Sequence, residues 1–262
     1  MADFPYITTE RTGGIGRVTF NRPELENRYN VAMMGEIRDA VQAMAADDAV
    51  RVVVLAGAGE TFCAGADPAF LDQIAGMDAA EIKATVYNNF QGAVRAIKLC
   101  PKPTIAEVRG PAFVAGCEMA VACDFRLADE TARFREGWID FGLVPPLGGM
   151  FLLPQLVGLS KATEMVMLGT TVAAADAAAI GLVNKCLPGD QLATEVETLT
   201  AKLAAGPARA YAVAKSGLRR AMESSLAAEW EFNLEAQTML IAGLDFKEAV
   251  AALKAARPPR FG

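Results

Sequence analysis

Apolar residues along the first two thirds of the chain form short β-rich runs that alternate with longer runs of helical spacing. The short runs predict strands over 15–20, 52–55, 104–108 and 125–128. The longer runs predict helices over 31–45 and 79–99, and a further helix that begins near Gly116. Alternation of strands and helices predicts an α/β fold with a mostly parallel sheet.

The pattern changes near residue 190, after which only helical spacing remains. We expect helices over 191–204, 207–222, 226–241 and 246–256. The sequence therefore predicts an α/β core over 1–190, followed by a helical region over 191–262.

Composition places the chain among globular proteins. It has 262 residues, 53% of them hydrophobic and 21% charged. The N-terminus lacks the basic and apolar regions of a signal peptide, and no apolar run is long enough to span a membrane. We therefore expect a soluble, cytoplasmic protein with no membrane partner. The net charge of −6 argues against a nucleic-acid partner.

Two residue types limit the chemistry. The five cysteines are scattered without a C-x-x-C motif, so we expect reduced thiols and no metal site. The chain has no histidine. Nucleophile–histidine arrangements are therefore excluded, and acid–base chemistry falls to carboxylates, Tyr, Lys or Cys.

A single carboxylate stands out in the stretch 105–129. Glu118 is the only charged residue from Pro111 through Cys123, and it falls in the first turn of a predicted helix. Apolar surroundings raise the pKa of a carboxyl, which favours a functional role. The alternative is an acid that the helix dipole favours in any first turn.

Small residues characterise a second stretch, 59–71, which follows the predicted strand 52–55. Ala64, Gly65 and Ala66 would let a ligand approach the backbone closely. Taken alone, this string is typical of a plain turn. The glycines before it, at 57 and 59, do not complete a dinucleotide-binding fingerprint.

Together and in this order, the two stretches resemble the crotonase superfamily, the enoyl-CoA hydratase/isomerase family. The likeness extends over essentially the whole chain, through Asn21-Arg22-Pro23 with Asn27, the segment 132–149, and Ala178 to Val183. It implies a crotonase-like spiral of ββα units, with a C-terminal helical region that joins three chains. The implied substrate is an acyl-CoA thioester, with coenzyme A as part of the substrate and no other cofactor. The implied assembly is a homotrimer or a dimer of trimers.

The resemblance also implies roles for individual residues. In this family two backbone N–H groups hold the thioester oxygen, and the matching positions here are Ala66 and Ala115. Glu118 matches the first of two glutamates that flank a water in the hydratases. This sequence departs from the family at Val114, usually a small residue, and at Ala115, usually glycine.

The second hydratase glutamate would fall four residues before Gly142, where this sequence has Trp138. If the segment is extended, Glu136 and Asp140 lie on the same face as Trp138 and are candidates for the missing role. If it is helical or turned, that argument does not hold. The plainer alternatives are a hydrophobic wall of the acyl pocket for Trp138 and a salt-bridge partner for Asp140.

The remaining candidates for substrate binding lie in the early loop and around the second stretch. They are Leu25, Arg28, Ala64, Gly65, Asp67, Phe70 and Val114, together with Trp138 and Asp140. Lys254 and Arg257 are candidates to reach the CoA of a neighbouring subunit, or else belong to a solvated surface.

Several functions remain open from the sequence. The first is an enoyl-CoA hydratase or isomerase with Glu118 as proton carrier. Trp138 favours an isomerase, C–C lyase or hydrolase variant of it. A dehalogenase-type enzyme would share a tryptophan at this position, but by resemblance it uses a histidine base. The last alternative is a non-catalytic crotonase-like protein.

Overall fold

The computed structural model describes residues 4–261, and its core is built on two sheets. In these residues the larger sheet has six strands in the order β1-β2-β3-β4-β6-β9. β1 runs antiparallel to β2, and the other neighbours are parallel. The bounds are β1 (Ile7–Thr12), β2 (Ile15–Phe20), β3 (Val52–Gly57), β4 (Thr104–Val108), β6 (Phe125–Asp129) and β9 (Lys185–Leu187).

A smaller sheet continues from the ends of these strands. In the described chain it contains β5 (Pro111–Phe113), β7 (Arg133–Arg135) and β8 (Val172–Ala173), in the order β5-β7-β8. β4 leads into β5, and β6 leads into β7, so successive turns of the chain contribute one strand to each sheet. This repeated arrangement gives the spiral of units that was expected.

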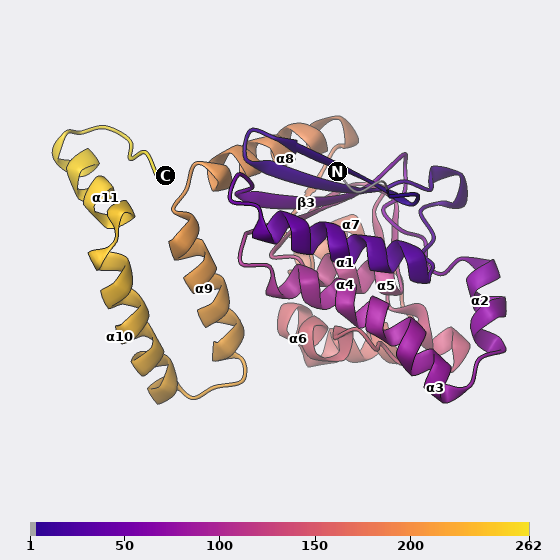
Figure 1. The fold of residues 1–262 in the computed structure, drawn as a ribbon. Helices are drawn as coiled ribbons and strands as arrows, with labels where there is room; N and C mark the ends of the chain where they lie inside the picture. The colour runs from indigo at the N-terminus through magenta and orange to yellow at the C-terminus, as the bar shows by residue number, and fades with distance from the viewer. Residues whose placement is uncertain (1–3, 262) are drawn as a thin grey trace.

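Helices cover both faces of the larger sheet (Figure 1). α1 (Val31–Ala46), α4 (Asn88–Leu99) and α5 (Ala115–Ala122) lie on one face, within the main apolar cluster. α8 (Gly189–Ala204) lies on the other face, where Leu192 and Val196 pack against Val52 and Val54 of β3. Burial on both faces explains why β3 is a continuous apolar run instead of an alternating one.

Other segments differ from the expected pattern or were not expected. The predicted helix 79–99 is a short α3 (Ala79–Glu81), a π-helical turn η2 (Ile82–Tyr87) and then α4. The helical elements that were not expected are η1 (Pro23–Leu25), α2 (Pro68–Ala75), η3 (Gly137–Phe141), α6 (Gly149–Met167) and α7 (Ala174–Ala179), and the strands that were not expected are β1, β5, β7, β8 and β9.

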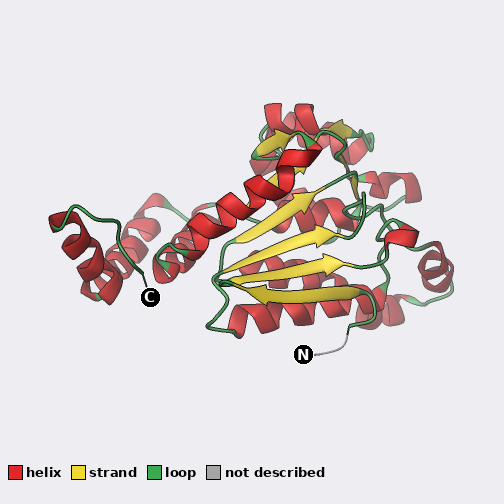
Figure 2. Ribbon diagram, turned by 90° about the horizontal axis from the view of Figure 1, so that it is seen from above, coloured by secondary structure: helices red, strands yellow, loops and turns green. Residues whose placement is uncertain are grey.

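The last three helices extend away from the core as a separate arm (Figures 1 and 2). They are α9 (Ala208–Ala221), α10 (Leu226–Ala242) and α11 (Leu244–Lys254). α8, by contrast, belongs to the layer that packs on the sheet. Within residues 4–261, no helix combines the length and apolar character that crossing a membrane requires.

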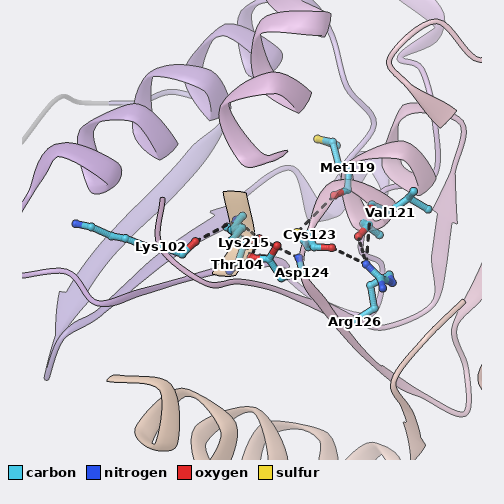
Figure 3. A network of polar contacts seen from close by, with 9 residues as sticks. Lys102, Thr104, Met119, Val121, Cys123, Asp124, Arg126 and Lys215 are labelled. Carbon is cyan, nitrogen blue, oxygen red and sulfur yellow. Dashed lines mark hydrogen bonds and ion pairs between the residues drawn. The ribbon is translucent and has the colours of Figure 1, made fainter. Parts of the chain in front are cut away.

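A polar network fastens this arm to the core (Figure 3). The Lys215 ammonium of α9 pairs with the Asp124 carboxylate at 2.6 Å and donates to the carbonyl of Lys102 at 3.1 Å. Asp124 also accepts the backbone N–H of Thr104, the first residue of β4. One lysine therefore connects α9 to the starts of two core strands.

Candidate active site

Two backbone segments meet at the carboxyl ends of β3 and β4. The N–H of Cys63 donates to the carbonyl of Pro111, and the N–H of Phe113 donates to the carbonyl of Cys63, both at 2.9 Å. A side chain at Gly116 would place its Cβ 2.8 Å from the Cβ of Cys63. Glycine at 116 is therefore required for the two segments to approach this closely.

The backbone around Ala66 is fixed by a bridge to the early loop. Tyr29 donates to the carbonyl of Gly65 and accepts from the N–H of Asp67, both at 2.9 Å. In a parallel bridge of this kind, residues 65 and 67 face Tyr29 and the N–H of Ala66 points the other way. Among the described residues, that N–H has no backbone carbonyl as acceptor.

Ala115 is the first residue of α5, so its N–H is one of the free donors of a helix N-terminus. The residue before it, Val114, has φ 58° and ψ −119°. A β-branched residue with positive φ is strained, and here the hydrogen bond from its N–H to the carbonyl of Arg135 at 2.8 Å helps hold it. A Cβ added at Gly65 would lie 3.9 Å from the Val114 Cγ2, so this side chain stands over the small-residue segment.

Glu118 lies one turn into α5 and is 1% exposed. Its Oε2 accepts the N–H of Leu147 at 3.0 Å and the N–H of Gly149, the first residue of α6, at 2.7 Å. Its Oε1 is buried and has no hydrogen-bond partner in the part of the chain that the structure describes. Burial raises the pKa of this carboxyl to about 7, and the two N–H donors limit the rise. One oxygen is thus anchored, and the other is available to exchange a proton near neutral pH.

The segment after β7 is not extended. Residues 137–141 form the 3-10 helix η3, so the condition under which Glu136 and Asp140 share a face with Trp138 is not met. Glu136 is 0% exposed and Trp138 is 8% exposed. Asp140 lies at the surface and pairs with Arg135 at 2.7 Å.

Glu136 lies close to Glu118 inside the protein. Burial raises the pKa of Glu136 well above its ordinary value, and the charge of Glu118 raises it further. Burial and then Glu136 likewise raise the pKa of the Cys117 thiol. The indole N–H of Trp138 lies near both carboxyls and lowers the pKa of each, although it makes no hydrogen bond of normal geometry among the described residues.

The remaining binding candidates divide between the site and the surface. Ala64, Gly65 and Phe70 are buried beside the bridge to Tyr29, where Phe70 packs edge-on against the Tyr29 ring at 6.4 Å. Asp67 caps α2.

Two basic side chains of the early loop are paired with carboxylates. Arg22 donates to the Asp67 carboxylate at 2.7 Å. Arg28 pairs with Glu26 at 2.9 Å, and Leu25 is exposed.

The two basic candidates near the C-terminus are distant from Glu118 in the chain fold. Lys254 ends α11, and Arg257 follows it and pairs with Glu248 at 2.7 Å. Both therefore belong to the arm formed by the last helices. Within one chain, neither belongs to the site around Glu118.

Tyr29 is a site residue that sequence reasoning missed. It is 1% exposed, and burial raises the pKa of its phenol well above the ordinary value. The N–H of Ala115 is directed at this phenol and lowers its pKa, whereas the charges of Glu118 and Glu136 raise its pKa. One feature of the sequence could have indicated Tyr29: it is an aromatic residue with a polar hydroxyl, and it lies in the same loop as Asn27.

No metal site accompanies these residues. In residues 4–261, no group of three or more Cys, Asp and Glu side chains is arranged to hold a metal ion. The candidate site brings together the backbone N–H groups of Ala66 and Ala115, the latter directed at the Tyr29 phenol, with buried carboxyls and aromatic side chains.

Comparison with known proteins gives matches over almost the whole chain. A model of the enoyl-CoA hydratase/isomerase family matches residues 10–262. A Rhizobium meliloti protein named "Probable enoyl-CoA hydratase" is 35% identical over 255 residues, which cover 97% of each chain. The 1,2-epoxyphenylacetyl-CoA isomerase of Escherichia coli is 28% identical over 256 residues, or 98% of each chain. The structure described as "Crystal structure of putative enoyl-CoA hydratase from Streptomyces coelicolor A3(2)" superimposes with a TM-score of 0.96 at 35% identity, covering 100% of this chain and 96% of that one.

Proposed function

The chain belongs to the enoyl-CoA hydratase/isomerase family, and from this premise we propose that it binds an acyl-CoA thioester and stabilises its enolate. The N–H groups of Ala66 and Ala115 would hold the thioester oxygen. Glu118 would carry the proton. Coenzyme A enters as part of the substrate, and the reaction needs no other cofactor.

The observation that carries this proposal is the state of Glu118. A carboxyl with one oxygen anchored by two N–H groups, the other oxygen unpartnered and a pKa of about 7 can both take and give a proton at neutral pH. Negative charge develops on the thioester oxygen when a proton leaves the α-carbon or a nucleophile attacks the β-carbon. Fixed N–H donors stabilise that charge, and each contributes about 3 kcal/mol in comparable sites.

Substitution of Glu118 tests the assignment. We expect Glu118→Gln to lower turnover by about 100-fold or more while binding of the thioester is retained, because only the proton-transfer group is lost. The matched control is Glu164→Gln, which removes the same charge from a surface pair with Lys161. Unchanged turnover in Glu118→Gln would refute the assignment of Glu118 as the proton carrier.

A double-bond isomerase is the second candidate, and Trp138 favours it. This residue replaces the second carboxylate that the hydratases of the family use, and a single carboxyl is enough to move a proton between two carbons. Incubation with crotonyl-CoA and with a 3-enoyl-CoA distinguishes the two, because a hydratase consumes the first and an isomerase converts the second into it. Tight binding without turnover of any CoA thioester would instead indicate a non-catalytic protein.

We further propose that the protein acts in the cytoplasm as a trimer or a dimer of trimers. Support for the assembly comes from α9 to α11. In these helices the buried residues are Glu229, Ala236 and Ala252, whereas large apolar side chains such as Trp230 and Leu234 are about two thirds exposed. Apolar surface of this extent is typical of an interface with other subunits.

A further inference from the structure

Unpartnered polar atoms gather beside the proposed proton carrier. Glu118 Oε1, both carboxyl oxygens of Glu136 and the indole Nε1 of Trp138 are buried, and none has a hydrogen-bond partner among the described residues. Native proteins leave few buried polar atoms in this state, because each loses its hydrogen bonds to water without replacement. A concentration of them in one place requires a proton, a ligand or both.

The surroundings of Glu136 hold no counter-charge. The groups that face it are Glu118 and Cys117 of α5, Tyr29 of the early loop and the Trp138 indole. None of these is a cation. The neighbouring Arg135 is engaged elsewhere, with the carbonyl of Gly169 and the Asp140 carboxylate. Burying an ionised carboxylate without a partner is very costly, so Glu136 must carry a proton in the resting protein.

The two carboxyls are unequal in a way that fixes their roles. Glu118 accepts two backbone N–H groups at the start of α6, and such donors favour the ionised form. Glu136 accepts no backbone N–H among the described residues, and the Cys117 thiol and the Trp138 indole beside it lower its pKa less than burial and the Glu118 charge raise it. When two carboxyls interact at close range, ionisation of one suppresses that of the other. The pair therefore holds one proton in common, with Glu118 as the base and Glu136 as the acid.

We propose that Glu136 is a second catalytic residue, the acid that complements Glu118, and that the pair directs this enzyme to add water to a 2-enoyl thioester. The inference rests on the proposed function and makes it more specific. Hydratases of the family would carry the second carboxylate at position 138, where this chain has Trp138. Here the second carboxyl comes from Glu136, two residues earlier. Trp138 then contributes its N–H beside the pair.

The step balances without any other reactant. Glu118 takes one proton from water, and the water oxygen forms a bond to the β-carbon. The π electrons of the double bond move to form an enolate, whose oxygen is held by the N–H groups of Ala66 and Ala115. Glu136 then gives its proton to the α-carbon, which yields a 3-hydroxyacyl thioester. A proton passing from Glu118 to Glu136 restores the starting state.

Glu136→Gln tests the proposal in the full-length protein, with Glu164→Gln as the matched control. We expect Glu136→Gln to bind crotonyl-CoA but to hydrate it about 100-fold more slowly or worse, since the acid is lost. Its pH–rate profile should lose the alkaline limb that reports the acid. Glu136→Asp keeps the acid and should recover part of the rate. It also provides a test of the role of Glu136 if Glu136→Gln folds poorly.

Infrared spectroscopy provides a readout that needs no turnover. At a pH about two units above the Glu118 pKa of about 7, where Glu118 is ionised, we expect the carbonyl stretch of a buried protonated carboxyl in the wild type, in Glu118→Gln and in Glu164→Gln, and its loss in Glu136→Gln. Survival of this band in Glu136→Gln, or hydration at the wild-type rate, would overturn the proposal.

The same variants separate this proposal from the function on which it rests. Isomerisation of a 3-enoyl-CoA that depends on Glu118 but not on Glu136, without hydration of crotonyl-CoA, would overturn the role of Glu136 and leave the enolate-stabilising function standing. A wild-type protein that acts on no acyl-CoA thioester would overturn both.

Discussion

Gly149 is the residue on which the position of Glu118 depends most directly. Its N–H donates to Glu118 Oε2 at 2.7 Å, and a Cβ at this position would lie only 2.9 Å from the same oxygen. We predict that Gly149→Ala displaces the carboxyl and lowers turnover by about 100-fold, since small misplacements at a reacting centre have effects of that size. Steady-state kinetics with crotonyl-CoA and a 3-enoyl-CoA measure it. The control is Gly76→Ala, where an added Cβ meets nothing closer than 3.6 Å, and equal loss in both variants would contradict the prediction.

Burial of Glu118 also has a consequence for stability. Its pKa rises from 4.5 in the unfolded chain to about 7 in the folded protein. A raised carboxyl pKa stabilises the fold below the unfolded value, and this stability declines as the pH rises and is lost above the folded value. We predict that Glu118→Gln, which cannot ionise, gains up to about 3 kcal/mol over the wild type between pH 5 and pH 8. Urea unfolding at both pH values tests this, and a difference that does not change with pH would be incompatible with it.

The sequence identified part of this site and missed the rest for a physical reason. Glu118 was evident because it stands alone among apolar residues, and burial is what shifts its pKa. Trp138 was evident only as a departure from the family. The proximity of Glu136 and Tyr29 to Glu118 depends on how η3 and the early loop turn, and the residue pattern does not specify those turns. Spacing made both Glu136 and Asp140 candidates, with a salt bridge as the plainer alternative for Asp140; the fold buries Glu136 and pairs the exposed Asp140 with Arg135.

At the scale of whole elements, Lys215 is the main polar link between α9 and the core. It bridges Asp124 and the carbonyl of Lys102, and its side chain is only 12% exposed (Figure 3). We predict that Lys215→Met weakens the docking of α9 by about 2 kcal/mol, the size expected for hydrogen bonds to a charged group. Hydrogen exchange of the α9 amides should become faster. Lys202→Met, on the exposed face of α8, is the control, and identical exchange in both variants would exclude this role for Lys215.

Elements with a regular pattern were predicted well, and irregular ones were not. The strands 15–20, 52–55, 104–108 and 125–128 all exist. The strand 52–55 is a continuous apolar run because it is buried on both faces, whereas 15–20 shows the alternation of a half-buried strand. α6 escaped prediction since it is apolar on most sides and contains Pro154 and a kink at Gly158 with φ 76°. The short strands β5, β7 and β8 have two or three residues each, too few to show a period.

At the scale of the molecule, the C-terminal arm exposes most of its large apolar side chains. The side chains of Leu218, Trp230, Leu234, Leu244 and Leu253 are between 66% and 80% exposed. A cavity of about 420 Å³ lies between α9 and the core, where Leu218 of α9 and Met222 just after it face Val121 of α5 and Leu152 of α6 across it, and Glu118 is not among its lining residues. Three helices with so little buried surface do not make a stable unit alone, because helical stability comes mainly from packing an apolar face.

We therefore predict that the arm is completed by other copies of the same chain, and that Trp230→Glu disrupts the assembly. Light scattering should give the mass of a trimer or hexamer for the wild type and of a monomer for the variant. A charge placed in an apolar interface must be desolvated without a partner, so the loss of association should be nearly complete at micromolar protein.

The control is Glu231→Gln at the adjacent exposed position, which should keep the wild-type mass. A monomeric wild type, or an oligomer that survives Trp230→Glu, would mean that the arm is covered in some other way. If the monomeric variant also loses thioester turnover, the assembly is required for the site around Glu118, even though every residue of that site comes from one chain.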